Sequence, residues 1–124
     1  MPSIVIIEHD PLMRSLVAEW LTADGHNVHG LADDNAQTLS PADLVIVDVY
    51  MPRARGCERL GTARRAYPGV PIIAVSGQFR AGLDTAGPTA RALGVDRVIA
   101  KPFGRKALLQ AVRSVIGRPV MNTG

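Results

Sequence analysis

Short apolar runs alternate with amphipathic segments along most of this chain. Strand-like runs lie at residues 4–7, 27–31, 44–47, 72–75 and 98–100. Those at 4–7, 44–47 and 72–75 are continuously apolar, as is typical of parallel strands covered on both faces. The pattern therefore predicts five short strands separated by helices or connecting segments.

Helical spacing of apolar residues marks the segments between these runs. The first predicted helix opens at Pro11, since proline is tolerated in a first turn, with Asp10 as its N-cap. Gly25 ends this helix. Further helices are predicted at 56–66, 88–93 and 105–116, with a shortened second helix of two turns at most at 34–39.

Strands that alternate with helices predict an α/β fold. The expected architecture is a doubly wound five-stranded parallel sheet, (βα)5, with helices on both faces. A chain of 124 residues is long enough for one domain with one core. We expect this domain to span residues 1–117 and the tail over 118–124 to be flexible.

The composition excludes several classes of protein. No apolar run approaches the roughly 20 residues that a membrane-spanning helix needs, and the N-terminus lacks the basic segment of a signal peptide. Cys57 is the single cysteine, so neither an internal disulfide nor a multi-cysteine metal site is available. These features predict a cytoplasmic protein without a membrane partner.

The net charge of +3 comes mainly from arginines that are spread along the chain. No dense basic block is present, which favours solvated helix faces over a stripe that binds nucleic acid specifically. His26 directly precedes the second predicted strand and His29 lies within it, and we expect both to be surface histidines.

Polar residues directly follow four of the apolar runs. Asp48 ends the third run, Ser76 the fourth and Lys101 the fifth, while residues 8–10 form an acidic cluster after the first. In open α/β sheets, ligands bind at the carboxyl ends of the strands. An acid, a hydroxyl and an ammonium are therefore predicted to converge on one polar site.

The order and spacing of these landmarks resemble the receiver domain of two-component response regulators, over nearly the whole chain. The landmarks are Glu8-His9-Asp10, Asp48, Met51-Pro52 with Gly56, Ser76-Gly77, and Lys101-Pro102-Phe103. The resemblance implies a flavodoxin-like fold. It also implies a protein that is not an enzyme, beyond Mg²⁺-dependent self-phosphorylation and dephosphorylation of an aspartate.

The family transfers a phosphoryl group from a histidine kinase to an aspartate, and the resemblance assigns the acceptor role to Asp48. Lys101 would pair with the new phosphoryl group. The Ser76 hydroxyl and the Gly77 backbone N–H would donate hydrogen bonds to its oxygens. The peptide bond between Lys101 and Pro102 is expected to be cis.

The resemblance also implies a Mg²⁺ site formed by Glu8, Asp48 and the backbone carbonyl of Tyr50. His9, however, stands where receivers commonly carry a second acid that contacts the metal. Mg²⁺ takes oxygen ligands, whereas imidazole suits Zn, Cu, Fe or Ni. Four outcomes remain open: weak or lost metal binding, entry of Asp10 into the site, a softer metal bound through His9, or weak Mg²⁺ binding by Glu8 and Asp48 alone.

The partners implied are a sensor histidine kinase or a phosphotransfer protein and a downstream protein target, with a homodimer as a further option. These residues contain no output domain, so phosphorylation of Asp48 would control an interaction with another protein. The alternative hypothesis is a pseudo-receiver, a phosphorylation-independent interaction module. His9 motivates this alternative, as does Val98, which stands where many receivers carry a mobile Tyr or Phe.

Overall fold

A five-stranded parallel sheet organises the chain in the computed structural model, which describes residues 2–31, 42–49, 53–77, 79 and 84–117. The strands run in the spatial order β2-β1-β3-β4-β5, and every neighbouring pair is parallel. Their bounds are β1 (Ser3–Ile7), β2 (Asn27–Leu31), β3 (Leu44–Asp48), β4 (Ile72–Ser76) and β5 (Arg97–Ala100). All five predicted strands are confirmed to within one residue at either end.

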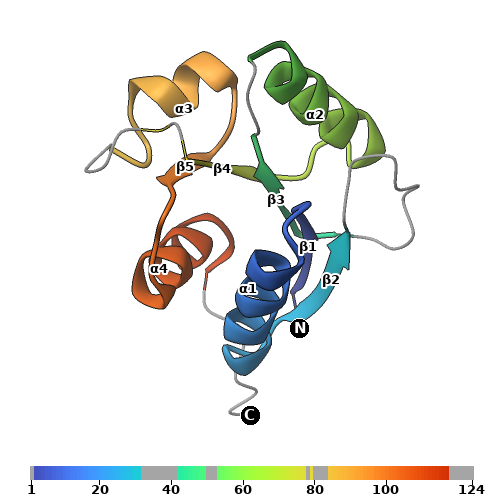
Figure 1. The fold of residues 1–124 in the computed structure, drawn as a ribbon, viewed down its shortest axis with the longest axis vertical. Helices are drawn as coiled ribbons and strands as arrows, with labels where there is room; N and C mark the ends of the chain where they lie inside the picture. The colour runs from blue at the N-terminus through green and yellow to red at the C-terminus, as the bar shows by residue number, and fades with distance from the viewer. Residues whose placement is uncertain (1, 32–41, 50–52, 78, 80–83, 118–124) are drawn as a thin grey trace.

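Helices cover both faces of this sheet (Figure 1). The helices of the described residues are α1 (Pro11–Ala23), α2 (Arg53–Ala66), α3 (Pro88–Leu93) and α4 (Arg105–Ile116). In Figure 1, α1 and α4 lie on one side of the sheet, and α2 and α3 lie on the other. The doubly wound α/β architecture is therefore confirmed.

The predicted start of α2 at Gly56 is wrong, because the helix already begins at Arg53. Glycine disfavours a helix interior by only about 0.5–1 kcal/mol, which packing of a helix face can offset. Leu60 and Ala63 provide that packing, with 2% and 1% of their surface exposed. The predicted second helix at 34–39 and the tail at 118–124 lie outside the described residues.

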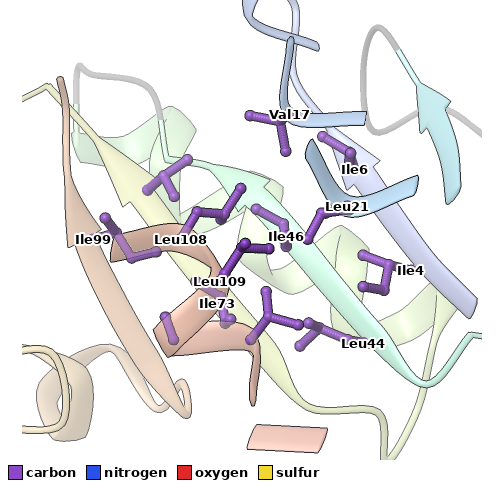
Figure 2. Close-up of a cluster of buried hydrophobic side chains, with 13 residues drawn as sticks. Ile4, Ile6, Val17, Leu21, Leu44, Ile46, Ile73, Ile99, Leu108 and Leu109 are labelled. Carbon is purple, nitrogen blue, oxygen red and sulfur yellow. The ribbon is translucent and has the colours of Figure 1, made fainter. Parts of the chain in front are cut away.

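Alternate residues of the strands build two separate cores. Ile4 and Ile6 of β1 face α1 and α4, whereas Val5 and Ile7 pack toward α2 and α3. Figure 2 shows the first of these cores, where strand side chains meet Leu108 of α4. Burial on both faces explains why the strands are apolar at successive positions.

A substitution of Leu108 tests how much the core shown in Figure 2 contributes to stability. The side chain of Leu108 is fully buried in this core. Leu108→Ala is expected to lower the free energy of unfolding by about 3 kcal/mol, because it removes buried methyl groups and leaves a cavity. Urea denaturation measures this loss. Leu12→Ala is the matched control, since Leu12 is 81% exposed. Equal stabilities of the two variants would contradict this account of the core.

A polar contact joins the end of α1 to α4. Arg113 of α4 donates a hydrogen bond to Oδ1 of Asp24, the C-cap of α1. Nε2 of His26 lies 3.4 Å from Oδ2 of the same carboxylate. His26 is only 2% exposed, so the prediction of a surface histidine is wrong here, whereas His29 is exposed as expected.

The backbone explains the burial of His26. Gly25 adopts a φ of 94°, and the N–H of His26 then donates to the carbonyl of Leu21 at 3.1 Å. The chain thus turns back beneath the end of α1. Burial lowers the pKa of His26 below its ordinary value, and the positive charge of Arg113 acts in the same direction, while Asp24 opposes them.

The lowered pKa of His26 predicts a pH-dependent stability. As the pH falls below about 6.5, the unfolded chain takes up the proton before the folded chain does. Stability contributed by neutral His26 is therefore present above that pH and decreases below it. We expect the free energy of unfolding to fall more steeply in wild type than in His26→Gln between about pH 7.5 and about pH 5.5.

Denaturation curves across this pH range measure both slopes, with His29→Gln as the control that keeps the wild-type slope. Identical slopes in wild type and His26→Gln would show that His26 does not carry the effect.

Candidate functional site

The register of the strands brings their carboxyl ends to one edge of the sheet. Ile7 pairs with Val47, Asp48 with Val75, and Ser76 with Ala100. The residues that end or follow these strands are Glu8, Asp48, Ser76 and Lys101. This edge is therefore the place where the polar residues of four different strands meet.

Two buried carboxylates and one ammonium form the centre of this edge. Glu8 and Asp48 are 3% and 4% exposed. Nζ of Lys101 lies 2.6 Å from Oε1 of Glu8 and 3.3 Å from Oδ1 of Asp48. The ammonium bridges the two acids, with its shorter contact to Glu8.

This environment changes the pKa values of two groups. Burial raises the pKa of the Glu8 carboxyl, and the neighbouring Asp48 adds to this, while the hydrogen bond from Lys101 offsets part of it. Burial acts to lower the pKa of Lys101, but the hydrogen bond to Glu8 and the charge of Asp48 outweigh it and raise the pKa. Lys101 therefore stays protonated at neutral pH.

His9 contacts the opposite oxygens of the same two carboxylates. Its Nδ1 lies 3.5 Å from Oε2 of Glu8 and 3.2 Å from Oδ2 of Asp48. The imidazole is half exposed, with 50% of its side-chain surface accessible. One donor atom from each of Glu8, His9 and Asp48 lies within 4.8 Å of the others, so these residues could together hold a metal ion.

Asp10 is the N-cap of α1, as the sequence predicts. Its Oδ1 accepts hydrogen bonds from the N–H groups of Leu12 at 3.0 Å and Met13 at 3.4 Å. Removing such a cap costs about 1 kcal/mol. The carboxylate of Asp10 is thus engaged in starting the helix, while its backbone N–H lies 3.3 Å from Oε2 of Glu8.

Ser76 ends β4 at this edge of the sheet, and Gly77 directly follows the strand. Ser76 is buried, and its carbonyl accepts a hydrogen bond from the N–H of Lys101 at 2.9 Å. A Cβ built on Gly77 would meet nothing within 4 Å, so the space beside its backbone is open. The peptide bond between Lys101 and Pro102 is cis, as predicted. Tyr50 lies outside the described residues.

Arg14 is a residue of this edge that the motifs do not predict. Its Nη1 donates to the backbone carbonyl of Glu8 at 2.7 Å. The stem of Arg14 passes so close to Gly30 that a Cβ there would lie 3.0 Å from its Cγ. The signal in the sequence is that Arg14 is the only basic residue between Pro11 and Ala23.

The donor set of this site differs from the all-oxygen set that Mg²⁺ prefers. Mg²⁺ prefers near-octahedral oxygen coordination, in which waters occupy several positions, whereas the described group offers two carboxylates and an imidazole nitrogen. Asp10 cannot supply the missing acid without giving up the cap of α1. The site is therefore one carboxylate short of an all-oxygen set.

Fold and site together define an α/β domain with a buried acid pair and a lysine at the carboxyl edge of its sheet. A family model described as the response regulator receiver domain matches residues 4–113. The chain belongs to this family of two-component signalling domains. Receiver domains of this family interact with histidine kinases or phosphotransfer proteins and typically bind Mg²⁺.

Individual relatives agree with this assignment. The transcriptional regulatory protein CpxR of Klebsiella pneumoniae is 29% identical over 122 residues, which are 95% of this chain and 50% of CpxR. The chain thus spans about half the length of the curated relatives it matches. No helix among the residues with described structure is long and apolar enough to cross a membrane.

Solved structures share the fold. A response regulator receiver protein from Burkholderia phymatum is 25% identical, with a TM-score of 0.74 over 96% of this chain and 98% of that chain. The response regulator TrrA of Thermotoga maritima, in a complex with Mg²⁺ and BeF, is 24% identical, with a TM-score of 0.70 over 93% of this chain and 99% of that chain. At this identity, TrrA shows the likeness of fold alone.

Proposed function

We propose that this receiver domain, over residues 1–117, accepts a phosphoryl group on Asp48 from a sensor histidine kinase or a phosphotransfer protein. The observation that carries the proposal is the 3.3 Å contact between Oδ1 of Asp48 and the Lys101 ammonium at the carboxyl edge of the sheet. Membership of the receiver family supports it.

The proposed transfer is an in-line displacement. A carboxylate oxygen of Asp48 attacks the phosphorus, and the P–N bond of the donor phosphohistidine breaks on the opposite side. The electron pair remains on the histidine nitrogen, which takes a proton from solvent. Asp48 becomes an acyl phosphate, and the added anionic oxygens require fixed positive charge and hydrogen-bond donors.

The chain's own residues can meet this requirement. Lys101 carries the positive charge. Burial acts to lower its pKa, but the neighbouring Glu8 and Asp48 outweigh burial and raise the pKa. We assign the Ser76 hydroxyl and the Gly77 backbone N–H as donors to the phosphoryl oxygens. The open space beside Gly77 leaves room for those oxygens to approach the backbone.

The proposed consequence of phosphorylation is a change in affinity for a downstream protein target or for a second copy of the chain. A phosphoryl group adds about −1.5 to −2 charges, and a new charge at the edge of the sheet can shift a balance between two conformations. Because the chain spans about half of its relatives, this output is proposed for the domain alone.

Asp48→Asn tests the proposal. Wild type incubated with acetyl phosphate and Mg²⁺, Mn²⁺ or Co²⁺ is expected to gain one phosphoryl group by intact-mass spectrometry, and Asp48→Asn is expected to gain none. Asp10→Asn is the matched control, because asparagine also caps helices well and the acceptor remains. Absence of the adduct from wild type with all three metals would overturn the proposal.

A second candidate function is a pseudo-receiver that binds its partner without phosphorylation. The contact of His9 Nδ1 with Oδ2 of Asp48 at 3.2 Å favours it. Val98 favours it too, since this fully buried side chain packs in the core beside α2 and α3 and has no ring to rotate. Equal partner binding by wild type and Asp48→Asn would support this function, whereas a partner specific for the phosphorylated form would exclude it.

A further inference from the structure

We propose that Glu8, His9 and Asp48 form a site for a first-row transition metal ion such as Zn²⁺ or Co²⁺, with Nδ1 of His9 as a direct ligand. The inference goes beyond the proposed function, because it needs these three donors and does not require Asp48 to be phosphorylated.

The orientation of the donors supports a shared ion. Nδ1 of His9 faces Oε2 of Glu8 and Oδ2 of Asp48, while Lys101 contacts the other oxygen of each carboxylate. Lys101 and His9 thus contact different oxygens of the acid pair. An ion bound by the imidazole, Oε2 of Glu8 and Oδ2 of Asp48 would leave both contacts of the ammonium in place.

The spacing of the donors distinguishes two coordination geometries. In a tetrahedral site with bonds of about 2.0–2.1 Å, neighbouring donors lie about 3.3–3.4 Å apart. In an octahedral Mg²⁺ site with bonds of similar length, neighbouring donors lie about 2.9 Å apart. The separations of His9 Nδ1 from the two acids are 3.5 Å and 3.2 Å, which are nearer the tetrahedral value, and all three donor atoms lie within 4.8 Å of one another.

The chemical type of the donors also favours a transition metal over Mg²⁺. Glu8 and Asp48 contribute two negative charges, and Lys101 at 2.6 Å from Glu8 cancels one of them. This compensation weakens the Coulomb attraction of the site for any divalent cation, so selectivity depends on the type of the donors. A transition metal gains a bond to the imidazole nitrogen, a ligand that suits Zn and similar ions.

The burial of the site fits one open coordination position. Glu8 and Asp48 are held beneath the surface, whereas half of the His9 side chain is exposed. The carboxylates are fixed at the ends of β1 and β3, and the half-exposed imidazole is the ligand most accessible to solvent. Three protein ligands with an accessible fourth position are the arrangement found in reactive zinc sites.

Ring nitrogen chemical shifts test the ligand directly. Untagged protein with ¹⁵N-labelled histidine is titrated with Zn²⁺ without any phosphodonor, and the three histidines report separately. We expect Nδ1 of His9 to show the large shift of a metal-bound nitrogen while His26 and His29 remain unchanged. Unchanged ring nitrogens of His9 at saturating Zn²⁺ would overturn the proposal.

Calorimetric titrations with Zn²⁺ and with Mg²⁺ test selectivity in wild type, His9→Asp and His29→Gln. The ratio of the Mg²⁺ Kd to the Zn²⁺ Kd is expected to fall about 100-fold in His9→Asp, since even outer-shell partners of a metal contribute 10–100-fold. His29→Gln should keep the wild-type ratio. An unchanged ratio in folded His9→Asp, or in His9→Gln should His9→Asp not fold, would contradict the assignment.

Phosphorylation is not read out in either experiment. Metal binding through His9 can therefore succeed when phosphorylation of Asp48 fails, and the two proposals are tested separately.

Discussion

His9→Asp is expected to raise the rate at which acetyl phosphate phosphorylates the protein in Mg²⁺ by about 10-fold or more, equivalent to about 1.4 kcal/mol of activation free energy. The substitution exchanges an imidazole for a carboxylate next to Glu8 and Asp48. Oxygen donors are the ligands that Mg²⁺ prefers. It also removes the 3.2 Å contact between His9 and Oδ2 of Asp48.

Two effects therefore act in the same direction, and His9→Asn separates them. Asparagine removes the imidazole from Asp48 but adds no negative charge. If the contact of His9 with Asp48 limits the rate of phosphorylation, His9→Asn and His9→Asp should be phosphorylated at the same rate. If the missing carboxylate limits this rate, only His9→Asp should be phosphorylated faster than wild type. Intact-mass time courses over a range of Mg²⁺ concentrations measure these rates, and a rate in His9→Asp no faster than wild type would contradict this account of His9.

Lys101→Met is expected to lower the rate of phosphorylation about 100-fold, since the loss of one positioned charge or donor at a developing anion costs about 10²–10³ in rate. Nζ of Lys101 lies within 3.3 Å of both acids. Methionine keeps most of the apolar stem and removes the ammonium. The phosphoryl oxygens would then face the Glu8 carboxylate without a compensating cation.

Lys106→Met is the matched control, because Lys106 lies exposed on α4. It should phosphorylate at the wild-type rate, and urea denaturation of both variants shows whether Lys101→Met remains folded. A Lys101→Met variant that is folded and phosphorylates as fast as Lys106→Met would contradict the role given to Lys101.

The arrangement of the fold follows from the sequence because its strands are buried on both faces. Continuous apolar runs such as 44–47 and 72–75 are favourable only where helices cover both sides of a sheet. In a parallel sheet, the carboxyl ends of the strands then share one edge. The proximity of Asp48, Ser76 and Lys101 is thus a consequence of the strand pattern.

Other features depend on contacts that no local pattern reports. His26 is buried because Gly25 turns the chain and the N–H of His26 bonds back to Leu21; a lone histidine between two elements gives no sign of this. The contact of Arg14 with the Glu8 carbonyl joins a helix side chain to a strand end. Such pairings are set by how α1 packs on the sheet.

The geometry within the site is likewise a matter of side-chain orientation. The sequence places Lys101 near both acids, but its shorter contact is to Glu8, at 2.6 Å, and not to Asp48. The sequence also identifies His9 as a departure from the usual acid. The two sets of carboxylate oxygens that Lys101 and His9 contact become visible only in three dimensions.

The central claim is that Asp48 is the residue that carries the phosphoryl group. Its most direct test is to phosphorylate wild type with acetyl phosphate, reduce the acyl phosphate to an alcohol with borohydride, and locate the reduced side chain by peptide mass spectrometry. The account predicts modification at residue 48 alone, with none at Glu8 or Asp10. Modification at either of those acids while Asp48 remains intact would contradict it.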